Sequence, residues 1–307
     1  MRRNATRKTV KEVDIDALIA QARYEGPAVT ADRLVGVDAC LRQLQGQIAL
    51  SARPELAERF GLQPSGTLFI GKPGTGKTLL ARYLAGHLGI PLYQFSADEF
   101  GSDPDNLHEV FRRLRGRRVL IFIDEISLIA QRREWMQDPA DRRMLSALLV
   151  SLDGLAAGER KERPWVIGAC TPDIHLDSAI HRSGRLGVII EFAPPSEQER
   201  RQLFELYLAG VPHSVSADDI GRLAEISGGA TGADIADYVS QAASEVLVEQ
   251  AAAEPVIEYR HLEKVVARRG FIGAERPERV PRWDTAVHEA AHPSPPTTSS
   301  APTPWQR

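Results

Sequence analysis

The octapeptide GKPGTGKT, Gly71 to Thr78, constrains the fold of this 307-residue chain more than any other stretch. It fits the pattern G-x-x-x-x-G-K-[ST], in which glycines let backbone N–H groups curl around phosphate oxygens. The apolar run TLFI (67–70) precedes it, and a helical pattern (77–88) follows it. A strand that feeds such a loop at a helix N-terminus predicts an α/β fold with a phosphate site, because the helix dipole favours anions there.

Four polar side chains in and after this loop predict the chemistry of a nucleoside triphosphate. Lys77 would reach the β- and γ-phosphates, and the Thr78 hydroxyl would bind Mg²⁺. The apolar run VLIFI (119–123) is followed by Asp124 and Glu125, at the carboxyl end of a strand, where parallel sheets bind ligands. We expect Asp124 to hold Mg²⁺ directly or through water, and Glu125 to orient and activate the attacking water.

Short apolar runs alternate with helical patterns as far as residue 194. The predicted strands are 67–70, 92–96, 119–123, 165–170 and 188–193. The predicted helices around them are 15–24, 34–54, 77–88, 106–113 and 144–152. This alternation indicates a parallel sheet with helices on both faces. Four further helical patterns predict a small all-helical domain after it, at 197–209, 217–226, 232–251 and 259–269.

The composition suggests four regions and excludes several classes of protein. The expected regions are an N-terminal arm (1–30), a nucleotide-binding α/β domain (31–194), a helical domain (195–272), and a linker with a disordered Pro/Ser/Thr-rich tail (273–307). The net charge of -3 predicts no nucleic-acid partner. No apolar run reaches the roughly 18–20 residues of a membrane span, so we expect a cytoplasmic protein. Two cysteines cannot build a disulfide framework.

Taken together, these motifs resemble the AAA ATPase module of the FtsH-type, ATP-dependent zinc metalloproteases, from about residue 34 to residue 292. The segments that carry the resemblance are RLVGVDA (33–39), GKPGTGKTLLAR (71–82), IFIDEIS (121–127), MLSALLVSLDGL (144–155), VIGACTPDIHLDSAIHRSGR (166–185) and SGGATGADIADYVSQAA (227–243). The resemblance implies an AAA+ P-loop NTPase sheet followed by a helical lid. It also implies ATP and Mg²⁺ as cofactors and a homohexameric ring.

The resemblance assigns roles to further residues. Those implied to bind the nucleotide are Gly36, Pro73, Gly74, Thr75, Gly76, Leu79, Gly232 and Ala233, with Asp234 in the same lid segment. Thr171 stands where the family has its sensor asparagine, and Arg185 falls on an arginine finger. Such a finger would stabilise the transition state in the neighbouring subunit's site.

Three departures from the family's pattern bear on activity. Thr171 has a shorter reach than asparagine, and Val188 stands where the family pattern places a second arginine finger. The segment 96–111, SADEFGSDPDNLHEVF, is shorter than the family's and lacks the aromatic–hydrophobic–Gly triplet of a substrate-gripping pore loop. We therefore expect slower hydrolysis and no processive threading of peptide.

His288, Glu289 and His292 spell H-E-x-x-H, a zinc-peptidase signature in which the glutamate is the general base. A catalytic zinc needs a third protein ligand, yet no Asp, Glu, His or Cys follows His292. Asp284 would lie about 12 Å from His292 along one helix. We interpret the motif as the remnant of a peptidase domain, truncated after HEAAH.

Three functions compete at this stage. The favoured hypothesis is a ring-forming ATPase that remodels a protein partner, with neither substrate nor adaptor identified by the sequence. The second is an ATP-dependent zinc metalloendopeptidase that needs the missing peptidase domain. The third is a nucleotide-gated scaffold with weak turnover, suggested by Thr171, Val188 and the short pore segment.

Overall fold

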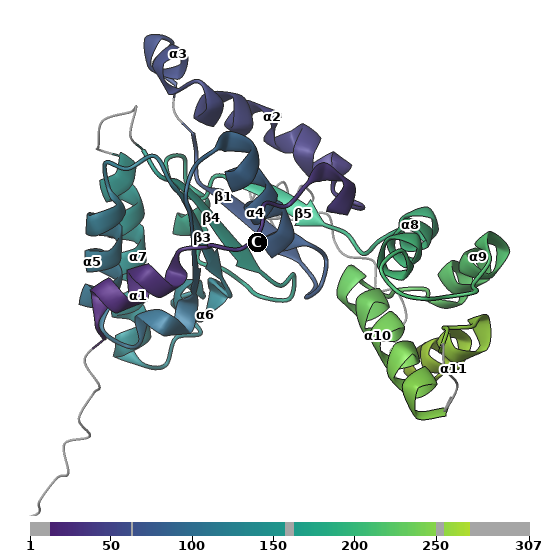
Figure 1. Cartoon of the computed structure of the whole chain (residues 1–307). Helices are drawn as coiled ribbons and strands as arrows, with labels where there is room; N and C mark the ends of the chain where they lie inside the picture. The colour runs from purple at the N-terminus through teal and green to yellow at the C-terminus, as the bar shows by residue number, and fades with distance from the viewer. Residues whose placement is uncertain (1–12, 63, 157–162, 250–254, 271–307) are drawn as a thin grey trace, which may run out of the picture. The chain divides into compact units, whose positions relative to one another are not determined.

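A five-stranded parallel sheet is the framework of the computed structural model, which describes residues 13–62, 64–156, 163–249 and 255–270 (Figure 1). The strand order is β2-β3-β4-β1-β5. The strands are β1 (Thr67–Gly71), β2 (Leu92–Ser96), β3 (Leu120–Asp124), β4 (Trp165–Cys170) and β5 (Val188–Phe192). The predicted parallel α/β sheet is therefore confirmed, and β1, which feeds the glycine-rich loop, lies between β4 and β5.

Helices cover both faces of this sheet (Figure 1). On β1, Phe69 packs into the apolar cluster beneath α2 (Asp38–Ala52) and α4 (Lys77–Leu88). Its neighbours Leu68 and Ile70 pack into the opposite cluster, beneath α5 (Pro104–Leu114) and α7 (Pro139–Ala156). Successive side chains of a strand point to opposite faces, so a strand covered on both faces is apolar throughout. This explains why β1, β3 and β4, which are buried along almost their whole length, were visible as apolar runs.

Several helix boundaries differ from the prediction. The helix expected over 34–54 is the shorter α2, preceded by the 3₁₀ turn η1 (Ala31–Arg33). Pro54 does not end helical structure but begins α3 (Pro54–Arg59), because proline suits the first turn, where its missing N–H is not needed. The short elements η2 (Ala97–Phe100), α6 (Ser127–Ala130) and η4 (Ser178–His181) were not predicted.

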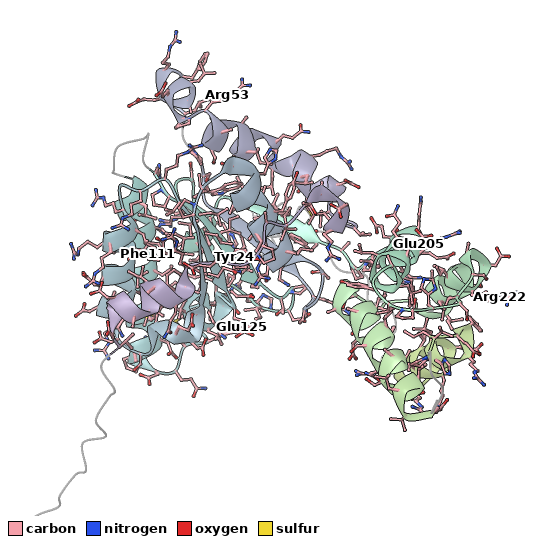
Figure 2. All side chains as sticks on the ribbon, viewed as in Figure 1. Tyr24, Arg53, Phe111, Glu125, Glu205 and Arg222 are labelled. Atoms are coloured by element: carbon pink, nitrogen blue, oxygen red, sulfur yellow. The ribbon has the colours of Figure 1, made fainter. Side chains whose placement is uncertain are left out.

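The described part of the expected N-terminal arm is packed against the sheet. Its helix α1 (Ile15–Ala22) contacts α5 and the edge strand β2. The Tyr24 backbone N–H donates to the Leu92 carbonyl at 2.9 Å, and Arg23 pairs antiparallel with Tyr93. The Arg82 guanidinium lies 4.6 Å from the centre of the Tyr24 ring, which is labelled in Figure 2. Residues 13–24 thus cover an edge that would otherwise expose unpaired backbone groups.

The C-terminal region is helical, as predicted. It comprises α8 (Glu197–Leu208), α9 (Ala217–Ile226), α10 (Gly232–Glu249) and α11 (Tyr259–Gly270), around an apolar cluster of their own. Ser196 and Ser216 cap α8 and α9 through reciprocal capping boxes, which satisfy N–H groups that a helix start leaves free. Within the described ranges, no helix has the length and apolarity needed to cross a bilayer.

Candidate functional site

The glycine-rich loop bends through two left-handed residues. Gly74 has φ +78° and Gly76 has φ +94°, values that residues with a side chain rarely adopt. Gly76 is the N-cap of α4, and the Thr75 hydroxyl donates to the Lys72 carbonyl at 2.8 Å. The loop therefore turns directly onto a helix N-terminus, where backbone N–H groups and the helix dipole favour an anion.

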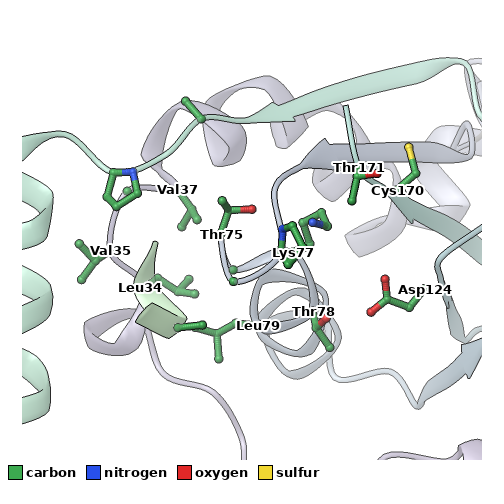
Figure 3. Close-up of a pocket in the computed structure, with 18 of the residues that line it drawn as sticks. Leu34, Val35, Val37, Thr75, Lys77, Thr78, Leu79, Asp124, Cys170 and Thr171 are labelled. Carbon is green, nitrogen blue, oxygen red and sulfur yellow. The ribbon is translucent and has the colours of Figure 1, made fainter. Parts of the chain in front are cut away.

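A cavity of about 640 Å³ opens beside this loop at the carboxyl edge of the sheet (Figure 3). Its volume falls in the range of pockets that hold small ligands and cofactors. Nearly all the sequence-predicted nucleotide and catalytic residues line it: Gly36, Pro73, Gly74, Thr75, Gly76, Lys77, Thr78, Leu79, Asp124, Glu125, Thr171, Gly232 and Ala233. The structure thus brings together groups from the loop, two strand ends and the helical region, while Arg185 lies elsewhere.

Lys77 is a buried cation at the base of the cavity, with 9% of its surface exposed. Its ammonium donates to the carbonyls of Gly71 and Lys72, at 2.5 Å and 2.9 Å. Burial lowers the Lys77 pKa, and the negative charge of Asp124 opposes that shift. A buried ammonium carried by the first residue of a helix suits a phosphate, whose charge would compensate the desolvated cation.

Thr78 and Asp124 supply oxygen ligands to the same cavity (Figure 3). Asp124 is the last residue of β3, and Thr78 is the second residue of α4. Hydroxyl and carboxylate oxygens are the ligands that Mg²⁺ prefers, usually one or two of them together with substrate phosphates and waters. The donor set therefore fits a magnesium ion bound with a nucleotide.

Glu125 has an unusual backbone. Its φ of +50° is positive, which no other non-glycine residue shows in the described parts of the chain. Three hydrogen bonds hold the turn: Glu125 N–H to Asp124 Oδ1, Ile126 N–H to the Ala169 carbonyl, and Leu128 N–H to the Glu125 carbonyl, each 2.9 Å. The Glu125 side chain, labelled in Figure 2, is exposed. Strained backbone of this kind persists where its surroundings impose it, often at functional sites.

The cavity also contains residues that the sequence analysis missed, including Arg33, Cys170, Leu203 and Tyr207. Burial raises the pKa of Cys170 to about 11, against the opposing charge of Lys77, so the thiol stays protonated near pH 7. Burial also raises the pKa of Tyr207, against the charge of Arg33. Cys170, the last residue of β4, could have been found as the residue that precedes Thr171. No pattern along the chain marks Tyr207, which only the packing of α8 brings to the cavity.

Asp234 and Ala233, in the first turn of α10, form hydrogen bonds that stabilise the local structure. The Asp234 carboxylate accepts hydrogen bonds from the Thr231 N–H, at 2.8 Å, and the Thr231 hydroxyl, at 2.7 Å. This arrangement fixes the start of α10, and Asp234 is not among the residues that line the cavity. The Ala233 N–H donates to the Gly74 carbonyl at 3.3 Å, which joins the helix start to the phosphate loop.

Arg185 is held firmly away from the cavity of its own chain. Its Nε and Nη2 donate to the two oxygens of Asp153, at 2.8 Å and 2.7 Å, and its Nη1 donates to the Ala179 carbonyl at 2.8 Å. This bidentate pair lowers the pKa of Asp153 and raises that of Arg185. With 14% of its side chain exposed, Arg185 is an ordered fork rather than a solvated surface arginine.

Val188 and the short pore segment also have defined places. Val188 pairs with Thr67 in the sheet, so an arginine there would start from a strand rather than a surface loop. In the segment 96–111, Phe100 is fully buried, and Asp103 caps α5 by accepting the Asp105 N–H at 3.0 Å. Only residues 101–103 lie between η2 and α5. This segment therefore presents no free aromatic loop.

The zinc motif lies outside the described residues, so the structure does not place His288, Glu289 or His292. Within the ranges that are described, no group of three or more His, Cys, Asp or Glu side chains is arranged to hold a metal ion.

Comparison with known proteins agrees with this geometry. Residues 67–194 match the family described as "ATPase family associated with various cellular activities (AAA)". The chain is 35% identical over 197 residues to Protein SAV of Sulfolobus acidocaldarius, covering 62% of this chain and 25% of that protein. It is 33% identical over 229 residues to the Cell division cycle protein 48 homolog of Archaeoglobus fulgidus, covering 72% and 31%. It is 31% identical over 291 residues to the ATP-dependent zinc metalloprotease FtsH of Marinobacter nauticus, covering 89% and 44%.

The chain thus spans between a quarter and less than half of the length of these relatives. The predicted similarity to FtsH-type proteases is confirmed, and the chain is also similar to proteins that are not named as proteases, such as the Cell division cycle protein 48 homolog.

Proposed function

We propose, from the premise that residues 67–194 form an AAA domain, that this chain hydrolyses ATP in a ring of its own copies and thereby remodels a protein partner. The observation that carries the proposal is the gathering of Lys77, Thr78, Asp124 and Glu125 along one cavity. A cation, two magnesium ligands and a carboxylate base at the carboxyl edge of a parallel sheet form the set that phosphoryl transfer to water requires.

Each side chain has one task in this proposal. Lys77 and the N–H groups of the loop would bind the phosphates, and Thr78 and Asp124 would hold Mg²⁺, which would supply positive charge beside the phosphate oxygens. Glu125 orients the attacking water and accepts its proton. Thr171, which directly follows β4, lines the cavity and would donate its hydroxyl to the γ-phosphate or to the water.

Ring formation is supported by the place of Arg185. The side chain does not line the cavity of its own chain, so a role in phosphoryl transfer requires the cavity of another copy. The resemblance to the family implies a homohexamer. The partner to be remodelled would be a protein.

The test is the ATPase rate as a function of protein concentration, for the wild type, Glu125→Gln and Arg185→Ala. We expect the rate per subunit to rise with concentration. Glu125→Gln should lower turnover by about 100-fold or more while ATP still binds, because only the base is removed. An assembled wild type with no ATP hydrolysis would overturn the proposal. Tight ATP binding with very slow phosphate release would instead favour the nucleotide-gated scaffold.

ATP-dependent zinc proteolysis is a second candidate. The observation in its favour is the match to a protein named ATP-dependent zinc metalloprotease over 89% of this chain. It would use His288 and His292 as zinc ligands and Glu289 as the base, with a third ligand from elsewhere. Metal analysis and a casein cleavage assay with ATP and zinc test it. A protein that binds no zinc and cleaves no casein rules it out for this chain.

A further inference from the structure

We propose that Gly168, in the middle of β4, is a positioning residue. Its lack of a side chain lets two residues pack closely against β4, one next to Glu125 in the chain and one next to Arg185. Ile126 follows Glu125 in the chain, and Leu186 follows Arg185. Both side chains pack against the bare backbone of Gly168. The inference rests on the proposed function, because it concerns how the base and the finger of an ATPase are held.

The space above Gly168 is already filled. A Cβ atom there would lie 2.7 Å from Ile126 Cδ1, 3.0 Å from Leu186 Cδ1 and 3.3 Å from Ile126 Cγ2. Carbon atoms in van der Waals contact lie about 3.5–4.0 Å apart, so even alanine would force a shift. Ile126 and Leu186 are both 0% exposed within the same apolar cluster. Close-packed neighbours leave them little room to move aside.

Ile126 transmits such a shift to Glu125. Its N–H donates to the Ala169 carbonyl at 2.9 Å, one residue along β4 from Gly168. This bond and the Ile126–Gly168 contact fix the residue after Glu125 against β4. The left-handed backbone of Glu125 is strained, so it depends on such fixed neighbours to persist. Displacing Ile126 would therefore turn the Glu125 carboxylate away from the reacting water.

Leu186 connects the contact at Gly168 to Arg185. Its N–H donates to the Ile180 carbonyl at 3.0 Å. A second glycine meets the same segment: a Cβ at Gly66 would lie 2.8 Å from Leu186 Cδ2 and 2.4 Å from the Arg185 carbonyl. Leu186 thus packs over both Gly66 and Gly168. A shift of Leu186 moves the backbone from which the Arg185 side chain reaches Asp153 and its surroundings.

Gly168 therefore influences the positions of two side chains that would act in two different nucleotide sites of a ring. Glu125 serves the nucleotide of its own chain, and Arg185 serves that of the neighbouring copy. Because both depend on the contact over Gly168, a side chain there should reduce the chemical step in both sites. The Kd for ATP should be unchanged, because Lys77 begins α4 and the phosphate loop joins β1 to α4. Neither takes part in the contact of Ile126 and Leu186 with Gly168.

The experiment compares Gly168→Ala with the double variant Gly168→Ala/Ile126→Val, which removes the Cδ1 atom that lies 2.7 Å from the new methyl group. The matched control is Gly221→Ala, because a Cβ there meets nothing within 4 Å. Three quantities are measured for each protein: kcat, the Kd for ATP, and hydrogen exchange of peptides that cover 124–129 and 180–187. Ile126→Val alone completes the set.

We expect Gly168→Ala to lower kcat between about 10-fold and 100-fold, as small misplacements of catalytic groups do, with the Kd for ATP unchanged. Exchange should rise in both peptides. Ile126→Val in the double variant should restore slow exchange in 124–129 and recover part of kcat. Gly221→Ala should match the wild type, and Ile126→Val alone, which keeps the Cγ2 atom over Gly168, should lose much less kcat than Gly168→Ala.

Unchanged kcat and unchanged exchange in Gly168→Ala would overturn the inference, and so would a loss that Ile126→Val does not repair. If the wild type hydrolyses no ATP, the proposed function fails, but the exchange of the two peptides still decides whether Gly168 seats them. If Gly168→Ala does not fold, Ile126→Ala removes the same contact from the other side. It must then speed exchange in 124–129 without weakening ATP binding.

Discussion

Gly74 shows what a single residue contributes to the cavity. A Cβ atom at this position would lie 2.6 Å from both the Ala233 Cβ and the Thr231 hydroxyl, and its φ of +78° is unfavourable for alanine. We therefore expect Gly74→Ala to weaken ATP binding by about 10-fold or more, which corresponds to roughly 1.4 kcal/mol. Fluorescence titration with an ATP analogue measures the Kd. Gly221→Ala, in open space, is the control, and equal Kd values for the two variants would contradict the prediction.

Glu109 provides a pH-dependent test at the same scale. Its carboxylate accepts hydrogen bonds from Arg112, at 2.7 Å and 2.6 Å, and from Arg113 at 2.7 Å, which lower its pKa from 4.5 to about 2. The folded pKa lies below the unfolded one. The stabilisation is therefore complete above about pH 4.5 and is lost as the pH falls towards 2.

The substitution Glu109→Gln should accordingly lower the Tm slightly at pH 7, since the ion pairs of an exposed carboxylate contribute little. The difference from the wild type should shrink between pH 4.5 and pH 2, where the wild-type carboxylate becomes protonated. Thermal unfolding followed by circular dichroism measures both. A Tm difference that grows towards low pH would show that Glu109 acts in some other way.

At the scale of elements, α1 and the residues after it protect the edge of the sheet. Tyr24 bonds to β2, and Arg113 of α5 forms an ion pair with Asp16 of α1. Deleting residues 1–24 should uncover β2 and promote aggregation, because an open strand edge pairs with other chains. Deleting residues 1–12 alone should not. Light scattering during incubation compares the two deletions, and equal behaviour would mean that the edge needs no cover.

The sequence predicted long elements well and short ones poorly, for a physical reason. The strands β1, β3 and β4 are buried on both faces, so β3 is apolar up to Asp124 and visible without any structure. A helix of one turn, such as α6, has too few residues to show a period. Its position follows from the turn at Glu125 and the bond of Ile126 to β4, which are tertiary facts. Pro54 misled the prediction because it can start a helix as well as end one.

At the scale of the whole molecule, the residues of the cavity fall into two groups. Some could be predicted from motifs along the chain, and others come to the cavity only through the tertiary fold. Lys77 and Thr78 belong to one motif, and Asp124 ends a strand, so their meeting at one sheet edge was predictable. Tyr207 belongs to α8, which follows the last strand of the sheet in the chain, and no sequence spacing predicts that it lines the cavity. The pairing of Arg185 with Asp153 was equally hidden, since it joins residues 32 positions apart.

The proposed role of Arg185 in a neighbouring subunit predicts that two inactive variants can complement each other in a mixed ring. Lys77→Ala should abolish hydrolysis in the cavity of its own chain, and Arg185→Ala should abolish it in the cavity of the next copy. Mixed at a constant total concentration, the two inactive variants should regain part of the wild-type rate. In a mixed ring, a Lys77→Ala subunit still offers its Arg185 to an intact cavity of an Arg185→Ala subunit.

The control for this experiment mixes Lys77→Ala with Glu125→Gln. Both substitutions damage the cavity of their own chain, so no arrangement of these subunits creates an intact site, and no rate should return. Recovery in the first mixture but not in the second means that Arg185 acts between chains. If co-assembly is seen by size-exclusion chromatography but neither mixture recovers, Arg185 acts within its own chain. Its bidentate pair with Asp153 would then be a structural contact that holds α7 to the segment before β5.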